Sequence, residues 1–275
     1  MNSEAFVADN ILDALIAVDI NSGNRTIIAD GTAGSGPALD AVRALAQDTT
    51  SDRLLALDDT LDALISIDPG NGSRSVLADS TTGAGPAFDE PTAISLDSDN
   101  ARAFVSDDGL DALLVVDLTT GDRTVVSSAT LGAGPVFDSP TGVAFDADNN
   151  RLLVVDDALN AMIAVDLTTG DRLVVSDAIT GAGPELLAPR TIALDAGNNR
   201  ALVAGGVEHN TLYWVDLTTG DRVVTADNTA TGLDLLFLTS VAFDSAFERA
   251  FAVDAEQRGL LVIELNSGQS AIVSK

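Results

Sequence analysis

The sequence predicts an all-β fold, a six-bladed β-propeller with four antiparallel strands in each blade. A turn aspartate recurs every 49 residues, at Asp19, Asp68, Asp117 and Asp166, and again at Asp216 after one extra residue. Each repeat contains four short apolar runs that are separated by turn residues and show no helical periodicity. A repeat of this length with four strands is typical of a propeller blade, whose sheet is covered on both faces by its neighbours.

The most regular repeat spans Pro140 to Asp177 and shows where the strands should lie. Its apolar runs are Gly142–Phe145, Leu152–Val155, Met162–Val165 and Leu173–Val175. Because most runs are apolar at consecutive positions, we expect both faces of each sheet to be buried. Applied to the whole chain, the pattern predicts one propeller domain over residues 1–275. Its repeats cover about residues 1–30, 41–79, 90–128, 139–177, 188–227 and 238–275.

Charged residues flank two of the turns in most repeats. Asp146 and Arg151 flank the turn between the first and second strands, and Asp166 and Arg172 flank the turn between the third and fourth. Gly170 lies in the second of these turns, at a position that requires a positive φ. We predict that both Asp–Arg pairs face each other across their strands and serve the structure.

The connectors between repeats share a Gly-x-Gly-Pro motif, which no helical pattern follows. A dinucleotide-binding loop is therefore a poor interpretation, and we predict shaped turns between blades. The motif occupies Gly34–Pro37, Gly83–Pro86, Gly132–Pro135 and Gly181–Pro184, and the fifth connector reads Gly232-Leu233-Asp234-Leu235 instead.

Blade 1 lacks its innermost strand within this chain. The first strands of the other repeats end at Asp48, Asp97, Asp146, Asp195 and Asp244, whereas the chain enters blade 1 in its second strand, at Ala5–Ala8. The missing strand would leave unpaired backbone groups at an edge. Three accounts are open: the sequence is trimmed from a longer protein, blade 1 has three strands, or a strand from another chain completes it. The last account would permit self-association through the open edge.

The repeat resembles a known family. The pattern Pro140-x-Gly142-Val143-Ala144-x-Asp146, followed by Val154-Val155-Asp156-Asp157-x-x-Asn160-x-x-Ile163, resembles the NHL repeat. That resemblance implies a six-bladed propeller related to the gluconolactonase and paraoxonase types, in which Glu, Asn and Asp from different blades hold a calcium ion. The chain departs from the pattern after Asn160, where Ala161 and Met162 replace the usual basic residue, and it offers no residue-by-residue match to the calcium ligands.

The charge of the chain excludes some partners. The formal net charge is −28, and Lys275 is the only lysine. Such a surface repels phosphate backbones, so we expect no nucleic acid partner. No run of 18 apolar residues occurs, so we expect no membrane insertion. The chain has no cysteine, and residues 1–10 show no signal peptide pattern.

Acidic residues end the second strands, on the face to which the connectors lead. They are Asp9, Asp58, Asp107, Asp156 and Asp254, with Gly206 in place of the acid in blade 5. Carboxylates around one funnel mouth could bind Ca²⁺, which prefers several oxygen ligands. Alternatively, each aspartate caps its own loop by accepting hydrogen bonds from backbone N–H groups. Calcium is thus a candidate ligand, and no cofactor is required.

Departures from the repeat mark the candidate binding residues. Arg43 and Arg190 occupy a position that is threonine in other blades, such as Thr141. They lie three repeats apart, so we predict that they face each other across the funnel mouth. Two guanidinium groups there could orient an anionic or sugar-acid ligand, or each could pair with a neighbouring aspartate.

Blade 5 contains the only histidine, tyrosine and tryptophan of the chain, His209, Tyr213 and Trp214. His209 could act as a general base if the protein is an enzyme, and Trp214 could stack on a sugar ring. The alternative is ordinary packing of the aromatic rings beside an exposed loop histidine.

These observations favour a non-catalytic binding or scaffold module, extracellular or periplasmic, that binds a protein or a glycan on the connector face. Enzymes on this fold should break the repeat at several positions with acid–base residues, and here the breaks are few. One alternative is a metal-dependent lactonase, esterase or polysaccharide lyase with a calcium ion in the funnel. Another is a structural subunit of an extracellular assembly or filament that is completed by strand addition.

Overall fold

The computed structural model describes residues 4–206, 210–228 and 233–275. Its strands form six antiparallel sheets, and the predicted all-β fold of a six-bladed β-propeller is confirmed. The chain divides into two compact units, Met1–Leu131 and Gly132–Lys275, and each unit contains three of the sheets. Among the described residues, no helix is long and apolar enough to cross a membrane.

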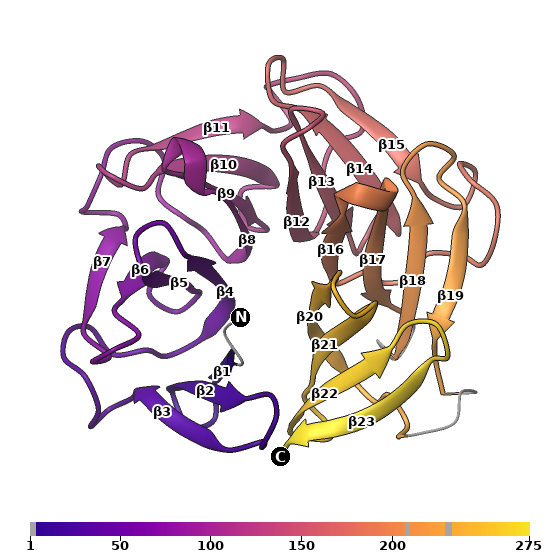
Figure 1. The fold of residues 1–275 in the computed structure, drawn as a ribbon. Helices are drawn as coiled ribbons and strands as arrows, with labels where there is room; N and C mark the ends of the chain where they lie inside the picture. The colour runs from indigo at the N-terminus through magenta and orange to yellow at the C-terminus, as the bar shows by residue number, and fades with distance from the viewer. Residues whose placement is uncertain (1–3, 207–209, 229–232) are drawn as a thin grey trace. The chain divides into compact units, whose positions relative to one another are not determined.

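The first unit contains blades 1 to 3 (Figure 1). Blade 1 consists of β1 (Glu4–Asp9), β2 (Ala14–Asp19) and β3 (Arg25–Ala29). Blade 2 consists of β4 (Val42–Asp48), β5 (Arg53–Asp58), β6 (Ala63–Ile67) and β7 (Arg74–Ala78). Blade 3 consists of β8 (Pro91–Asp97), the short 3-10 helix η1 (Ser98–Asn100), β9 (Arg102–Asp107), β10 (Ala112–Asp117) and β11 (Arg123–Ser127).

The second unit contains blades 4 to 6. Blade 4 consists of β12 (Pro140–Asp146), β13 (Arg151–Asp156), β14 (Ala161–Asp166) and β15 (Arg172–Ser176). Blade 5 consists of β16 (Thr191–Asp195), the 3-10 helix η2 (Ala196–Asn198), β17 (Arg200–Gly205), β18 (Thr211–Asp216) and β19 (Arg222–Ala226). Blade 6 consists of β20 (Leu238–Asp244), β21 (Arg249–Asp254), β22 (Gly259–Glu264) and β23 (Gln269–Ser274).

Strand order within each sheet follows the chain, so every strand pairs with its sequence neighbours. The inner strands end at the five predicted aspartates, and blade 1 has three strands, as the sequence predicted. Within each unit, the repeated apolar runs fill the layers between adjacent blades. In the first unit, Leu55 and Leu57 of β5 pack with Leu114 and Val116 of β10 in one fully buried cluster. Removal of this surface from water is the main force that stacks the blades.

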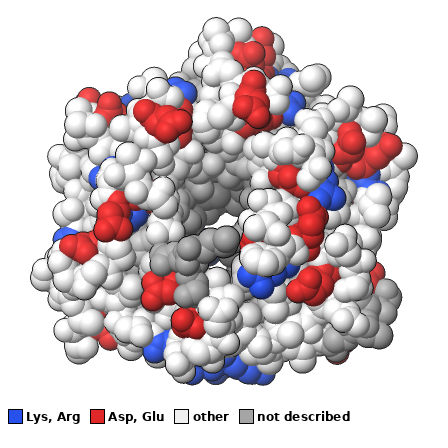
Figure 2. Space-filling model, in the orientation of Figure 1, with Lys and Arg blue, Asp and Glu red and all other residues white. Residues whose placement is uncertain are grey.

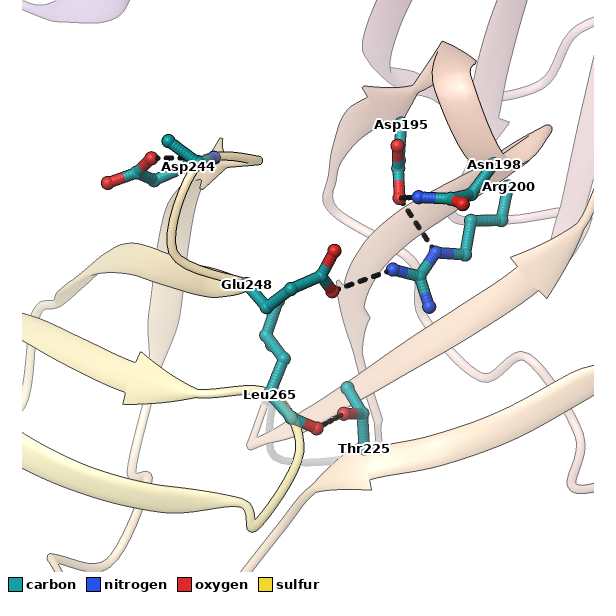
Figure 3. Close-up of polar contacts among 8 residues, drawn as sticks. Asp195, Asn198, Arg200, Thr225, Asp244, Glu248 and Leu265 are labelled. Carbon is teal, nitrogen blue, oxygen red and sulfur yellow. Dashed lines mark hydrogen bonds and ion pairs between the residues drawn. The ribbon is translucent and has the colours of Figure 1, made fainter.

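The predicted pairs across the first-to-second-strand turn are confirmed in all five complete blades. In these pairs an arginine Nε donates to an aspartate Oδ2, at distances between 2.7 and 3.0 Å. Arg200 shows the arrangement (Figure 3), since its Nε lies 2.8 Å from Asp195 Oδ2 and its Nη2 lies 2.9 Å from Glu248 Oε2 of blade 6. The aspartate side chains are mostly buried, so these charges are compensated where water is scarce.

The predicted pair across the third-to-fourth-strand turn is wrong. Asp166 Oδ1 instead accepts hydrogen bonds from the backbone N–H groups of Thr168 and Thr169, at 2.7 and 3.0 Å. These bonds within the turn lower the pKa of Asp166. Arg172 lies opposite Val165 in the ladder, and its guanidinium donates to the carbonyl oxygens of Pro135 and Gly132 in the connector.

The same contact joins a connector to the outer strand of the next blade at four places. We call the four residues connector arginines: Arg74, Arg123, Arg172 and Arg222. In the first unit, Arg123 Nε donates to Pro86 O at 2.6 Å and Nη1 donates to Thr82 O at 2.9 Å. The guanidinium also lies 5.4 Å from the centre of the buried Phe88 ring. Charge-assisted bonds and a cation–π contact therefore hold the connector in place.

The glycines of the motif are required by the close approach of this connector. Gly83 and Gly85 have φ values of 76° and 103°. A Cβ atom added to Gly83 would lie 2.0 Å from Gly121 O, and one added to Gly85 would lie 2.0 Å from Arg123 O. Only glycine fits both the backbone conformation and the space. The Gly-x-Gly-Pro motif is thus the predicted turn between blades.

The fifth connector, which lies partly outside the described residues, departs from this scheme together with its partner. Ser270 occupies the position of the connector arginine in blade 6, opposite Ile263. Its Oγ donates to Leu233 O at 2.7 Å and accepts from Leu233 N at 3.0 Å. The connector that has lost Gly-x-Gly-Pro is therefore the one that meets a blade without the arginine.

We predict that Arg123→Ala lowers the free energy of unfolding by about 3 kcal/mol, because connector carbonyls then lose a charged donor in a buried site. Arg25→Ala is the matched control. Arg25 stands at the equivalent position of blade 1 but is exposed, with no hydrogen bond or ion pair among the described residues. We expect a loss below about 0.5 kcal/mol there. Urea denaturation measures both, and equal losses would contradict the role given to the connector.

Candidate functional site

The candidate site is the end of each blade at which the inner strand begins and the second strand ends. In blade 4, for example, Pro140 at the start of β12 lies opposite Asp156 at the end of β13. The last residues of the connector and the turn between the second and third strands meet there. We call this region the connector end. Only the last part of each connector reaches it, because the Gly-x-Gly-Pro part lies against the outer strand of the next blade.

The four predicted metal-binding aspartates, Asp58, Asp107, Asp156 and Asp254, lie at the connector end and are fully buried. Each carboxylate joins two segments. Asp58 Oδ2 accepts from Asp40 N of the connector at 2.8 Å, and Oδ1 accepts from Leu61 N of the turn at 3.0 Å. The other three make the same two bonds, Asp107 with Asp89 N and Leu110 N, Asp156 with Asp138 N and Leu159 N, and Asp254 with Leu236 N and Gln257 N.

These bonds show that the repeated aspartates cap loops. Loop capping is the second of the two interpretations that the sequence offered, beside a metal site. Each of the four side chains directs both oxygens at backbone donors. Within the described ranges, no group of three His, Cys, Asp or Glu side chains is placed to hold a metal ion. Calcium binding in the funnel, the other interpretation of these aspartates, is left to experiment.

Asp107 differs from a surface carboxylate in its titration. Burial raises its pKa to about 6, and the charges of Asp89 and Asp62 act in the same direction. The hydrogen bonds from Asp89 N and Leu110 N oppose that effect, because they stabilise the ionised form. The folded protein therefore holds a proton on Asp107 at a pH where an unfolded chain would have lost it.

Arg43 lies at the connector end of blade 2 in the first unit. Its Nε and Nη2 donate to Asp59 Oδ2 at 2.9 and 2.6 Å, so it pairs with a neighbouring aspartate. Half of the Arg43 side chain is exposed (50%), whereas Asp59 is mostly covered (18%). The pair therefore presents a solvent-accessible guanidinium that is held in one orientation.

Arg190 occupies the equivalent position in the second unit, where it is half-buried. Its guanidinium lies 5.5 Å from the centre of the Phe237 ring, and its backbone N–H donates to Ala204 O at 2.8 Å. Arg43 and Arg190 belong to different units, so their predicted arrangement across a funnel mouth stays a prediction. In blade 4, the threonine at this position, Thr141, donates its hydroxyl to Pro189 O at 2.7 Å.

Of the predicted binding residues in blade 5, His209 lies outside the described residues. Trp214 lies in the layer between blades 5 and 6, where the Arg200 guanidinium is 3.8 Å from its ring centre. The Phe243 ring meets it edge to face at 5.3 Å. Tyr213 is buried. The Trp214 ring thus packs against Arg200 and Phe243 within the second unit. Its stacking on a sugar stays a prediction.

Gly205, and not Gly206, stands in the position of the buried aspartate in blade 5. Gly205 pairs with Thr211 as Asp156 pairs with Ala161. The one extra residue of this repeat therefore lies after Gly205, between β17 and β18, and not before the end of β17. Gly206 N donates to Leu187 O of the connector at 2.6 Å, much as Asp157 N, which follows the buried aspartate of blade 4, donates to Ser139 O at 2.9 Å.

Sequence reasoning missed the exposed apolar side chains of the connector end. In the first unit, Ile11, Leu12 and Leu61 are 78, 58 and 41% exposed. In the second unit, Val136, Leu159 and Leu236 are exposed as well. A signal for three of them was present, because Leu12, Leu61 and Leu159 each precede an Asp or Asn with positive φ in a tight turn. A side chain at such a turn tip points away from the sheet.

The comparisons with known proteins show a fold and no family. No protein-family model matches the chain, and no curated protein matches it. A solved structure described as "Crystal structure of Nidogen/Laminin Complex" contains a similar chain, with a TM-score of 0.73 and 14% sequence identity. The similarity covers 96% of this chain and 90% of that one. The chain thus has the fold of a six-bladed β-propeller, and its resemblance to the NHL family rests on the repeat pattern alone.

Side chains of both charges occur on the face that Figure 2 shows. Figure 2 shows acidic side chains in small groups on the visible face, several of them beside arginines.

We predict that Asp107→Asn flattens the dependence of stability on pH. The pKa of Asp107 is about 6 in the folded state against an ordinary value of 3.8, so the folded state binds the extra proton between these pH values. Wild type should therefore gain up to about 3 kcal/mol relative to the variant as the pH falls from about 7 to about 4. Denaturation curves at several pH values measure this, and parallel profiles would contradict the raised pKa.

We predict that neither calcium nor EDTA changes the melting temperature, because the buried carboxylates already bind backbone donors. A ligand that binds only the folded state would raise it. Calorimetry with added calcium, with magnesium as the control ion, measures the effect. A rise that is specific to calcium would restore the metal site that the sequence suggested.

Proposed function

We propose that the chain is a non-catalytic, protein-binding propeller module that binds its partner at the connector end. The observation that carries this proposal is the set of exposed apolar side chains at the connector end, of which Leu61 and Leu159 lie on turns that a buried aspartate caps. Leu61 is 41% exposed, yet its own N–H is bonded to the fully buried Asp58. Apolar side chains held in place before binding lose little entropy when a partner covers them.

The polar residues around these leucines fit a recognition surface. The guanidinium of Arg43 is held by Asp59 and remains accessible beside the turn that carries Leu61. Arginine in a fixed orientation forms bidentate hydrogen bonds with carboxylate groups and is common in binding hot spots. The buried aspartates behind the turns take part in loop capping, which leaves few groups free for acid–base chemistry.

The structural neighbour supports a protein partner, since the similar chain comes from a complex named for two proteins. An extracellular or periplasmic location is part of the proposal and rests on the sequence. A glycan partner is a further part, for which the accessible guanidinium of Arg43 is the supporting feature. The lactonase, esterase or lyase alternative rests on the family resemblance. The structural-subunit alternative rests on the open edge of blade 1.

The proposal predicts that Leu61→Glu impairs binding whereas Ile27→Glu does not. Both residues lie in the first unit and have similar exposure, 41 and 48%, but Ile27 lies on the outer strand β3. A phage-displayed library of linear peptides, selected on the wild-type chain, supplies the probes. Loss of one buried leucine at a binding hot spot should weaken the selected peptides about tenfold.

Thermal melts of both variants show that they remain folded. Peptides that bind wild type, Leu61→Glu and Ile27→Glu equally well would place binding away from the connector end. A selection that enriches no peptide above an unrelated control protein would count against a protein-binding function.

A further inference from the structure

We propose that a polar cleft in blade 2 binds a neutral sugar. The cleft lies between the turn that joins β4 to β5 and the turn that joins β6 to β7, at the opposite end of the blade from the connector end. We call this the far end. The cleft has a volume of about 330 Å³, within the range of about 300 to 1,000 Å³ that is typical of small-molecule sites. It is separate from the leucines of the connector end, so this inference and the proposed function can fail independently.

The first reason that the cleft is open is a missing hydrogen bond between the two turns of the far end. In blades 3 to 6 the residue after the turn acid donates its N–H to a carbonyl oxygen of the first turn, at distances between 2.9 and 3.2 Å. These pairs are Leu118 with Ala101, Leu167 with Asn150, Leu217 with Asn199 and Leu265 with Glu248. The equivalent residue of blade 2 is Pro69, which has no N–H group. The two turns of blade 2 are therefore not joined by this bond.

The second reason is a missing contact between side chains of the same turns. In blade 4, Asn150 Nδ2 donates to Thr168 Oγ1 at 3.2 Å, and blade 5 has the same bond at 2.7 Å. In blade 2 the equivalent residues are Asp52 and Gly70, which supply neither the amide donor nor the hydroxyl acceptor. The exposed carboxylate of Asp52 has no partner within the described part of the chain. It is thus available to a ligand.

The third reason is the small size of two side chains that line the cleft. Ser66 of β6 and Ser75 of β7 lie opposite each other in the ladder. Every equivalent pair in the other complete blades has a larger combined side-chain volume. These pairs are Val115 and Thr124, Ala164 and Leu173, Trp214 and Val223, and Val262 and Ala271. Blade 2 is therefore the complete blade in which the far end is filled least.

Arg53 forms one wall of the cleft and lacks a contact that its equivalent in blade 5 makes. The guanidinium of Arg200 lies 3.8 Å from the centre of the Trp214 ring. In blade 2 this place is left open by Ser66. Arg53 Nε donates to Asp48 Oδ2 at 3.0 Å, but its Nη1 has no acceptor among the residues that the structure describes. Its remaining N–H groups can therefore donate to a ligand in the cleft.

The groups that line the cleft match the hydroxyl groups of a sugar. Arg53 supplies donors, the carboxylates of Asp52 and Asp68 supply acceptors, and the hydroxyls of Ser66 and Ser75 can do both. Neither serine hydroxyl forms a hydrogen bond within the described residues. A sugar carries adjacent hydroxyls that donate and accept in the same way, so it can satisfy all of these groups at once.

The charges of the cleft favour a neutral ligand. Its lining contains two arginines and two aspartates, so their formal charges cancel. Arg74 already donates to Pro37 O at 2.7 Å and Ala33 O at 3.1 Å, and Arg53 is paired with Asp48. An anion would also be repelled by the formal net charge of −28, and a cation would meet the guanidinium in the wall.

The test titrates the isotope-labelled chain with glucose, galactose, mannose, fucose and N-acetylglucosamine in turn and follows the backbone amides by NMR. Each sugar is taken to about 50 mM, because a ligand with few atoms binds weakly. We expect at least one neutral sugar to shift the amides of Ser66, Asp68 and Ser75 in a saturable manner. Glucuronate and free arginine, the ionic comparators, should bind more weakly. The methyl glycoside of the best sugar separates two sources, because a site for a sugar within a glycan binds it and a site for a free sugar does not.

Variants assign the binding to the cleft. Ser75→Leu should weaken binding about tenfold or more, because the side chain that blade 4 carries at this position fills the cleft and removes a hydroxyl. Ser66→Val, which introduces the residue of blade 3, should weaken it as well. Thr124→Leu is the matched control, since Thr124 is the exposed equivalent of Ser75 in blade 3, and it should bind like wild type.

Thermal melts show that the variants remain folded. The proposal is overturned if no neutral sugar shifts the amides of the cleft, or if Ser75→Leu and Ser66→Val bind as well as wild type. It is also overturned if Thr124→Leu loses binding to the same extent, or if glucuronate or arginine binds more tightly than every neutral sugar.

Discussion

The contact between a connector arginine and the carbonyl groups of the preceding connector is the constraint on which four of the blade junctions depend. Close approach of the two backbones allows only glycine at the first and third motif positions, and it brings carbonyl oxygens together where few donors are available. Arg123 satisfies them and covers Phe88 at the same time. The buried aspartates at the connector end then fix the rest of the connector, so that the inner strand begins in register.

The repeat made the architecture predictable, but it did not predict the partner of each individual side chain. Four apolar runs in every repeat define the blades and their inner-strand ends, because burial of both faces imposes that pattern. The Asp166–Arg172 pair was wrong because the sequence shows that the two residues flank one turn, but not that each has a nearer backbone partner. Gly205 was missed because an extra residue in a loop can be counted before or after the end of a strand.

The candidate site was predictable only in part, for a related reason. Side chains that recur in most blades, such as Asp58 and Asp156, bind the loops of their own blade. Residues that break the repeat carry more information, but their partners lie elsewhere in the sequence: Arg43 with Asp59, Arg190 with Phe237 and Trp214 with Arg200. Exposed leucines gave a weak signal, because leucine is so common in the strands that its presence in a turn does not stand out.

The joint loss of Gly-x-Gly-Pro and of its arginine at Ser270 has a consequence for how such a chain changes over time. The segment that is copied, exchanged or grafted without disturbing its neighbours does not coincide with a sheet. A glycine connector transferred to face a serine would leave carbonyl groups without donors, and an arginine facing Leu233 would meet a different backbone path. The connector and the outer strand that it meets therefore have to change together. The unit that they form is offset in the sequence from the four strands of one blade.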